Sequence, residues 1–334
     1  MRKFTVTSDM SGKHVVKACI EAFPMLKPAE LFHALKRKDI RVDGKKTSQD
    51  IAVKEGQEVE VWLPDELFER KAAKAGGEKK DKKQSYKTAF ETKGLLIINK
   101  PQGLAVHTGK TVSDGTLIDL IRRETGYAQA ELCHRIDMNT GGLVMVAKNK
   151  KALEDAVALF KDNLITKRYR AIVLGTPDEG EPVVYDDGTV MYEIKAFLEK
   201  TRSGEVYIHD EHQPHDLPIA TRYRVIKTYK PAEYGMPEIS EIECELVTGR
   251  THQIRAQFAH LGYPVIGDGN YGRNKINVGF KAVGGAKLRH QQLYSTEILV
   301  GKVPSGNVHA DISGKTFKIA PEYELDFKEL GIKR

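Results

Sequence analysis

The stretch HRIDMNTGGLVMVAK, residues 134–148, decides how the larger part of this chain folds. It starts with a His-Arg pair and Asp137, passes through a turn of Asn, Thr and two Gly, and ends in an apolar run typical of a buried strand. Catalytic side chains concentrate on loops that a rigid scaffold positions. Asp137 is therefore a candidate functional carboxylate, although a lone Asp in a turn more often caps the backbone.

Three other segments accompany this stretch in a fixed order. They are residues 96–107 (LIINKPQGLAVH), 166–175 (TKRYRAIVLG) and 248–272 (TGRTHQIRAQFAHLGYPVIGDGNYG). The four together closely resemble the signatures of the RluA-type RNA pseudouridine synthases: N-K-P-x-G-x-x-x-H, H-R-L-D-x-x-T-S-G-L-L-x-x-A-K, K-x-Y-x-A-x-V-x-G, and G-R-T-H-Q-I-R with a following G-D-x-x-Y-G. The resemblance covers residues 94–300 or so.

The chain departs from these signatures at a few places. Ile136 and Val144 stand where the family has Leu, and Gly141 stands where it has Ser. Near the C-terminus, residues 293–295 read Leu-Tyr-Ser instead of the usual L-H-A. None of these changes touches Asp137, the position of the nucleophile in that family.

Length and composition indicate a soluble protein with more than one domain. A chain of 334 residues is long for one domain, and 40% hydrophobic with 30% charged residues is ordinary for a protein with a real core. No apolar run approaches a membrane span, and the first residues lack the apolar core of a signal peptide. Three scattered cysteines predict no disulfide framework, so we expect a cytoplasmic location.

Positive charge is concentrated at the N-terminal end. Residues 1–93 hold 21 Lys and Arg against 15 Asp and Glu, whereas the remaining residues hold 32 against 31. Basic side chains give sequence-independent affinity for phosphates. The surplus is equally compatible with a solvated Lys-rich surface or with an RNA-binding appendage.

Residues 1–63 read as a small α/β module. Pro28 suits a first helical turn, residues 40–42 alternate like a strand, and Asp43-Gly44 is a hairpin signal. The pattern resembles the ribosomal-protein-S-four-like (α-L) RNA-binding module, without its usual Ser-Arg and with Asp39 where Gly is typical. By that resemblance, the residues expected to bind RNA are Lys36, Arg37, Lys38 and Arg41.

The rest of the chain is expected to form a linker and a catalytic domain. Residues 64–93 carry nine Lys and Arg and little apolar periodicity, which predicts a basic flexible linker. Residues 94–334 predict an α+β domain with a large mixed, mainly antiparallel sheet. A helix follows the Asp137 strand with Leu153, Val157, Phe160 and Leu164 on one face, and residues 239–247 alternate like a strand with one wet side.

The resemblance implies isomerisation of uridine to pseudouridine. The C1′–N1 bond breaks, uracil turns, and C5 bonds to C1′, with no net redox change or hydrolysis, so we expect no cofactor and no metal. One carboxylate can suffice, because uracil leaves with its charge spread over two carbonyl groups. Asp137 is the expected nucleophile, or the equivalent base in a route through a glycal.

Other site residues follow from the same resemblance. Arg255 is the cation expected to keep Asp137 ionised, Tyr169 the aromatic residue that packs on the uracil and handles the C5 proton, and Ile254 a wall of the base pocket. A stacked base must be flipped out to be reached, and Arg135 is expected to fill the vacated space. The remaining contributors to RNA binding or to the positive rim are His134, Arg250, Lys100, Lys167 and His107.

Two motifs are set aside. Residues 103–111 look like a phosphate loop, but the spacing between the glycines is one residue too long for ATP binding. Residues 209–216 (HDEHQPHD) are rich in metal-ligand types without regular spacing, which favours a solvated loop.

The expected function is an RNA pseudouridine synthase that acts as a monomer on RNA, with neither DNA nor membrane as a partner. Ribosomal RNA of the large subunit is the preferred substrate and transfer RNA the alternative. A non-catalytic RNA-binding or ribosome-assembly factor is a rival that intact Asp137, Tyr169 and Arg255 disfavour. A nucleoside-processing glycosidase is a second rival, disfavoured because no second carboxylate is evident.

Overall fold

The computed structural model describes residues 1–334 except 27, 69–85, 109–114, 202, 233–234 and 332–334. The chain divides into two compact units, Met1–Lys83 and Gln84–Arg334. No helix among the described residues is long and apolar enough to cross a membrane.

The first unit packs helices on a small antiparallel sheet. Its strand order is β1-β4-β2-β3. The β2–β3 hairpin turns through Asp43 and Gly44, both with positive φ (50° and 73°), as the sequence predicts. The elements are β1 (Arg2–Thr5), α1 (Val15–Ala22), α2 (Pro28–Arg37), β2 (Ile40–Val42), β3 (Lys45–Thr47), β4 (Glu58–Val61) and α3 (Asp65–Phe68).

The linker predicted over residues 64–93 is too long at both ends. Asp65–Phe68 forms α3, and Phe68 is buried in the core of the first unit. Lys87–Glu91 forms β5, which pairs with β6 in the second unit. Residues 69–85, the middle of the predicted linker, lie outside the described residues.

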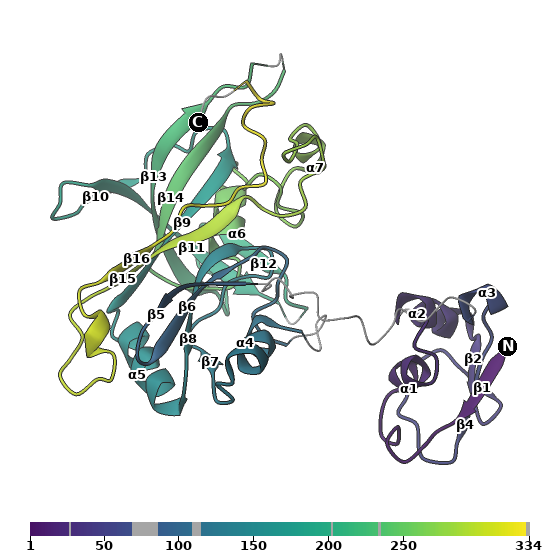
Figure 1. The fold of residues 1–334 in the computed structure, drawn as a ribbon. Coiled ribbons are helices and arrows are strands. Elements are labelled where there is room, and N and C mark those ends of the chain that lie inside the picture. The colour runs from purple at the N-terminus through teal and green to yellow at the C-terminus, as the bar shows by residue number, and fades with distance from the viewer. Residues whose placement is uncertain (27, 69–85, 109–114, 202, 233–234, 332–334) are drawn as a thin grey trace. The chain divides into compact units, whose positions relative to one another are not determined.

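The second unit is built on one large mixed sheet, mainly antiparallel, which confirms the predicted fold class (Figure 1). Its strands run in the order β10-β11-β13-β14-β9-β15-β8-β6-β5, with β12, β16 and β7 paired to β11, β15 and β8. The strands are β5 (Lys87–Glu91), β6 (Leu95–Lys100), β7 (Glu131–Leu132), β8 (Gly141–Ala147), β9 (Ile165–Leu174), β10 (Glu181–Val184), β11 (Val190–Lys200), β12 (Val206–His209), β13 (Leu217–Tyr229), β14 (Ile239–Leu246), β15 (Leu293–Val300) and β16 (Thr316–Lys318). The helices are α4 (Leu117–Thr125), α5 (Lys150–Lys161), α6 (Gln253–His260), α7 (Asn274–Asn277) and a 3-10 turn (Ala310–Ile312).

A single strand, β15, joins the two halves of this sheet. It pairs antiparallel with β9 and parallel with β8. Ser295 of β15 lies opposite Gly142 on one side and Tyr169 on the other. The turn that carries Asp137 and the strand that carries Tyr169 therefore meet at the same level of the sheet.

Helices α4 and α6 contribute to the same apolar core as Tyr169, whereas α5 packs into a second core. The predicted face of α5 is wrong in part, because Val157 is 46% exposed and the helix ends before Leu164. The buried positions include Ala152 and Ala156, whose small side chains let the helix approach the sheet closely.

The alternation predicted over residues 239–247 is confirmed for β14, but its polar side is not wet. Glu243 and Glu245 are 3% and 6% exposed, because arginines of the neighbouring strands cover them. Arg168 reaches Glu245 at 2.9 Å, and Arg224 reaches Glu243 at 2.8 Å. Paired charges thus replace solvent on this face of the sheet.

Candidate active site

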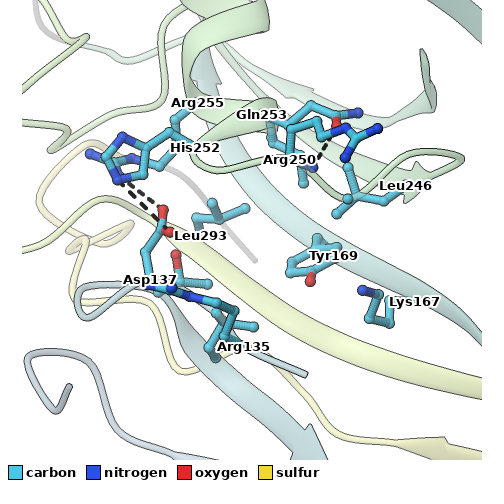
Figure 2. Close-up of a pocket in the computed structure, with 14 residues that line it drawn as sticks. Arg135, Asp137, Lys167, Tyr169, Leu246, Arg250, His252, Gln253, Arg255 and Leu293 are labelled. Atoms are coloured by element: carbon cyan, nitrogen blue, oxygen red, sulfur yellow. Dashed lines mark hydrogen bonds and ion pairs between the residues drawn. The ribbon is translucent and has the colours of Figure 1, made fainter. Parts of the chain in front are cut away.

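Asp137 lies in the turn between β7 and β8, and its carboxylate meets two side chains from the start of α6 (Figure 2). Arg255 donates from Nη1 to Asp137 Oδ2 at 2.9 Å. The Nε2 atom of His252 lies 3.9 Å from Asp137 Oδ1. The ion pair between Asp137 and Arg255 expected from the sequence is therefore present.

A second carboxylate, Asp268, holds Arg255 from behind. Arg255 donates from Nε and Nη2 to the two oxygens of Asp268 at 2.6 and 3.0 Å. Asp268 is fully buried, and the backbone amides of Asn270 and Tyr271 donate to its Oδ1 at 2.8 and 3.0 Å. Such a doubly bonded fork fixes the guanidinium plane.

The charges of this group are mutually stabilised. Burial opposes the charge of Arg255, but hydrogen bonds from the guanidinium to Asp268 and the negative charges of Asp268 and Asp137 outweigh it, so the pKa of Arg255 is raised. Burial likewise works against the charged form of Asp268, yet Arg255 and the two backbone amides lower its pKa. Arg255 and Asp268 therefore both carry full charge at neutral pH, with Arg255 shared between two carboxylates.

His252 adopts a left-handed backbone conformation (φ 55°) immediately before α6. Its Nδ1 is 2.8 Å from the hydroxyl of Tyr271, which orients the imidazole ring. Burial lowers the pKa of His252, and Arg255 adds to the effect while Asp137 opposes it. A neutral imidazole therefore faces Asp137 at neutral pH.

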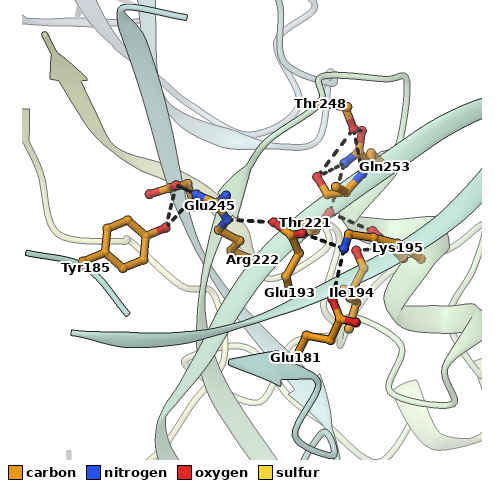
Figure 3. A network of polar contacts seen from close by, with 12 residues as sticks. Glu181, Tyr185, Glu193, Ile194, Lys195, Thr221, Arg222, Glu245, Thr248 and Gln253 are labelled. Atoms are coloured by element: carbon orange, nitrogen blue, oxygen red, sulfur yellow. Dashed lines mark hydrogen bonds and ion pairs between the residues drawn. The ribbon is translucent and has the colours of Figure 1, made fainter. Parts of the chain in front are cut away.

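Buried amides fix the start of α6 against the sheet (Figure 3). Gln253 accepts from the backbone amide of Arg250 and the hydroxyl of Thr248, and donates to Thr221 Oγ1 at 3.0 Å. Thr221 in turn donates to Gln257 one turn further along α6 at 2.7 Å. Buried polar groups that are all bonded specify one geometry, so this network sets the position from which His252 and Arg255 reach Asp137.

Lys100 supports the Asp137 turn from beneath. Its fully buried ammonium donates to the carbonyl oxygens of Pro101, Leu104 and Met138 at 2.8–2.9 Å. Burial lowers the pKa of Lys100 to about 7 and the charge of Asp137 opposes this. Three accepting carbonyls need the three N–H groups of the charged form, so we assign Lys100 to the ammonium state and to positioning the turn rather than to an RNA-facing rim.

Two departures from the family signatures compensate each other. The ring of Tyr294 occupies the space beside Gly141, where a Cβ would lie 2.4 Å from a ring carbon. The Ser usual at position 141 therefore does not fit beside Tyr294, which stands where the signature has His. Gly142 is required for a different reason, because its φ is 104° and a Cβ there would meet the backbone oxygen of Ser295.

A small pocket of about 70 Å³ opens beside Asp137 (Figure 2). Asp137 is the one carboxylate among its described lining residues. The lining is formed by Arg135, Ile136, Asp137, Thr140, Lys167, Tyr169, Leu246, Gly249, Arg250, His252, Gln253, Ile254, Arg255 and Leu293.

Tyr169 and Ile254 give this pocket apolar walls, as the sequence predicts. Burial raises the pKa of Tyr169 and the charge of Asp137 raises it further. The phenol therefore stays neutral at neutral pH, which suits packing against a base better than removal of a proton. Lys167 lines the pocket without a carboxylate within 4 Å among the described residues, and burial lowers its pKa.

The other sequence-predicted residues fall in different places. Arg135 and Arg250 line the pocket and are exposed. His134 does not line it, because its Nε2 accepts from the amide of Met145 at 3.1 Å and its ring packs against Phe160. This position fits orientation of the turn and not contact with RNA. His107 is exposed and also lies outside the pocket lining.

The basic residues of the first unit that the sequence predicts to bind RNA differ in their contacts. Arg37 pairs with Asp39 at 2.8 Å, and Arg41 stacks over Trp62, 4.7 Å from the ring centroid. Lys36 and Lys38 are exposed and have no ion pair within the part of the chain that the structure describes.

Sequence reasoning missed His252, Gln253 and Asp268. All three lie in the segment 248–272 that carries the G-R-T-H-Q-I-R and G-D-x-x-Y-G patterns, so the signal was present. The patterns alone gave no reason to place Asp268 behind Arg255, because that contact depends on how the chain folds back after α6.

Comparison with known protein families identifies the class of enzyme. The model of the RNA pseudouridylate synthase family matches residues 94–260, half of the chain, and the chain belongs to this family. Members of the family are isomerases, so the predicted enzyme class is confirmed.

Named relatives agree with this assignment. The ribosomal large subunit pseudouridine synthase C of Vibrio cholerae is 26% identical over 274 residues, covering 81% of each chain. The ribosomal large subunit pseudouridine synthase D of Zymomonas mobilis is 34% identical over 194 residues, so this chain spans 56% of that relative's length and 56% of its own. Human RNA pseudouridylate synthase domain containing 1 shares the fold, with a TM-score of 0.51 and 22% identity over 74% of this chain and 86% of the human chain.

Proposed function

We propose that this pseudouridine synthase modifies ribosomal RNA of the large subunit in the cytoplasm, and that Asp137 attacks C1′ of a flipped-out uridine. The observation that carries the mechanism is the ion pair in which Arg255 holds Asp137, the one carboxylate among the described residues of the pocket. The relatives that are named for the large ribosomal subunit support the choice of RNA.

Asp137 is presented in a state suited to nucleophilic attack. Arg255 binds Oδ2 through one hydrogen bond, while Oδ1 faces the neutral ring of His252. When Oδ1 bonds to C1′, the C1′–N1 bond breaks and uracil leaves as an anion with its charge spread over two carbonyl groups. Rotation of the uracil then brings C5 to C1′. The C5–C1′ bond forms as the C1′–Oδ1 bond breaks and the Asp137 carboxylate is regenerated, and loss of the C5 proton with protonation of N1 completes pseudouridine. In the alternative glycal route, Asp137 removes a sugar proton instead.

The walls of the pocket account for selection of a flipped base. Tyr169 and Ile254 offer apolar surfaces for the two faces of a pyrimidine, and Lys167 places a cation where a uracil carbonyl can accept. Arg135 is exposed at the pocket and can fill the gap that the extruded base leaves in the RNA.

The first unit is proposed to be an S-four-like RNA-binding module. Its helix α2, the β2–β3 hairpin and the exposed Lys36 and Lys38, which form no ion pair among the described residues, support this reading. Because phosphate contacts carry no sequence information, the module adds affinity while the second unit selects the uridine.

The experiment measures tritium release from large-subunit ribosomal RNA transcribed with 5-tritiated uridine, since C5 loses its hydrogen when it bonds to C1′. Asp137→Asn is expected to abolish release while it leaves folding and RNA binding intact, because the amide is nearly isosteric but not nucleophilic. The matched control is Asp162→Asn, an exposed Asp at the end of α5, which should keep wild-type activity.

The outcomes separate the parts of the proposal. Substantial turnover by Asp137→Asn of verified identity would contradict the mechanism. If tritium is released from transfer RNA transcripts and not from ribosomal RNA, the substrate is transfer RNA. RNA binding by the wild-type protein without release from either RNA would contradict catalysis.

A further inference from the structure

A second, larger cleft adjoins the candidate active site. Its volume is about 760 Å³, and Asp137, His252 and Arg255 line both this cleft and the small pocket. The remaining described lining comes from two segments, residues 138–139 of the Asp137 turn and residues 267–291. Any molecule in the cleft therefore lies directly beside a base held in the pocket.

One wall of the cleft carries two basic side chains from a basic segment of the chain. Residues 269–291, which we call the basic segment, contain five Lys and Arg and no Asp or Glu. Lys287 and Arg289 line the cleft and are exposed. Among the described residues, no carboxylate lies within 4 Å of either side-chain cation. Unpaired cations on one wall of a cleft are suited to phosphate groups.

The basic segment is held in place rather than loosely attached. Glu324 accepts from the backbone amide of Arg289 at 2.9 Å and from the His290 ring at 2.7 Å. Gln291 donates to Thr140 of the Asp137 turn at 3.1 Å. The backbone that carries Arg289 is thus anchored relative to the Asp137 turn.

The rest of the lining offers neutral hydrogen-bonding groups. The amide side chains Asn139, Asn270 and Asn274 lie in the cleft together with Gln291. Amides donate and accept, as recognition of ribose hydroxyls and base edges in single-stranded RNA requires. A cleft of this volume is within the range of roughly 300–1,000 Å³ that is typical of ligand sites, whereas the pocket beside Asp137 is far smaller.

We infer that this cleft binds the RNA strand next to the target uridine, with Lys287 and Arg289 contacting the phosphates that flank the flipped nucleotide. The inference rests on the proposed function. A target base in the pocket is joined through the RNA backbone to its neighbouring nucleotides, and these nucleotides must leave the pocket past Asp137, His252 and Arg255. The cleft is the opening that shares these three residues with the pocket.

The test compares two double variants of the full chain. Lys287→Gln/Arg289→Gln removes two charges from the cleft. The control, Lys302→Gln/Lys315→Gln, removes two exposed charges that follow the far end of β15 and have no ion pair among the described residues. The probe is a labelled nine-nucleotide RNA with one central uridine, bound at several salt concentrations. A second version of the probe carries uncharged methylphosphonate linkages on both sides of the uridine.

Three results are expected. The cleft variant should bind the charged probe on the order of tenfold more weakly, and the slope of log affinity on log salt should fall by about 1.4, since each contact to a single strand contributes about 0.7. The control should match the wild type. The uncharged linkages should weaken binding to the wild type but make little further difference to the cleft variant.

An unchanged salt slope in the cleft variant, or an equal loss in the control, would overturn the inference. Tritium release from ribosomal RNA by the wild type tests the proposed function separately. If the wild type releases tritium and the cleft variant binds RNA normally, only the cleft assignment fails. If the cleft variant loses affinity but the wild type releases no tritium, the assignment of the RNA surface stands and the proposed reaction fails.

Discussion

Asp268 accepts hydrogen bonds from the Nε and Nη2 atoms of Arg255, whereas Asp137 accepts one from Nη1. The paired bonds to Asp268 form a parallel fork that fixes the plane of the guanidinium. The buried Asp268 therefore sets the direction from which Arg255 reaches Asp137. One oxygen of Asp137 is bonded to Arg255, and the other lies 3.9 Å from Nε2 of His252.

Asp268→Asn should lower both stability and rate. Removing one member of a buried charge pair costs about 3 kcal/mol of the free energy of unfolding, and a misplaced Arg255 should slow the single-turnover step about 100-fold. Urea unfolding and tritium release measure the two effects. Asp268→Glu retains the charge and should recover part of the rate at conditions where both variants are folded. If Asp268→Asn and Asp268→Glu react at equal rates, Asp268 has only a structural role.

Arg255 and Arg135 should fail differently when each is changed to Ala. Loss of Arg255 leaves Asp137 without its cation and should slow the chemical step on every RNA. Loss of Arg135 should matter most for structured RNA, because an unstructured strand has little stacking to replace. Single-turnover rates on a folded and an unfolded uridine-containing RNA compare the two.

The expected pattern is a slow Arg255→Ala on both RNAs and a partial recovery of Arg135→Ala on the unfolded one. Arg250→Ala provides a matched control, since Arg250 is also an exposed arginine that lines the pocket. Identical losses for Arg255→Ala and Arg135→Ala on both substrates would remove the basis for giving them separate roles.

Gly141 and Tyr294 should be energetically coupled. Gly141→Ser forces a Cβ into the ring of Tyr294, so it should destabilise the second unit by about 1–3 kcal/mol. Adding Tyr294→His, the residue of the family signature, should restore much of this loss. A double-mutant cycle of unfolding free energies gives the coupling, expected to be 0.5–3 kcal/mol in magnitude. Additive effects would show that the two positions are not energetically coupled.

His134 should make the second unit less stable in acid. Burial lowers the pKa of His134 well below 6.5, so above that pH both folded and unfolded chains hold it neutral. Below pH 6.5 the unfolded chain binds a proton that the folded one does not, and the free energy of unfolding should fall by up to about 1.4 kcal/mol per pH unit.

Hydrogen exchange of peptides from Gly141–Ala147 measures this effect, because the amide of Met145 donates to His134. Tryptophan fluorescence is unsuitable, since the single Trp of the chain is Trp62 in the first unit. His134→Gln should flatten the pH dependence, whereas His107→Gln, at an exposed site, should leave it unchanged. If the pH dependence of stability persists in His134→Gln, it belongs to another titrating group.

The first unit should contribute salt-dependent affinity. Lys36→Gln/Lys38→Gln removes two exposed cations and should reduce the slope of log affinity on log salt for ribosomal RNA by about 1.4–1.8. Arg37→Gln should have a smaller effect, because Arg37 is already paired with Asp39. A filter-binding titration checks both. If the slope stays at its wild-type value, the module serves another purpose than RNA binding.

The sequence predicted those features that reside in contiguous motifs. Asp137, Tyr169, Ile254 and Arg255 do share one pocket, although they come from three separate segments. The mixed, mainly antiparallel sheet is also confirmed. These predictions succeeded because each motif carries both a residue type and the turn or strand that presents it.

The features that were missed depend on tertiary pairing. Residues Lys87–Glu91 have little apolar periodicity, and they form a strand because they pair with β6. The face of α5 was misjudged because Val157 has an apolar side chain, whereas the helix buries Ala152 and Ala156. The contact of Asp268 with Arg255 joins a position within α6 to one that follows the helix, which a local sequence pattern cannot connect.

The central place of β15 has a consequence for biosynthesis. The strands that present Asp137 and Tyr169 leave the ribosome early, but they become neighbours only when Leu293–Val300 inserts between them. At 5–20 residues per second, translation from Leu174 to Leu293 lasts roughly 6 to 24 s. During that interval the nascent chain holds Asp137 and Tyr169 without an assembled pocket. The pocket therefore assembles only after β15 has been synthesised, in a single late pairing event.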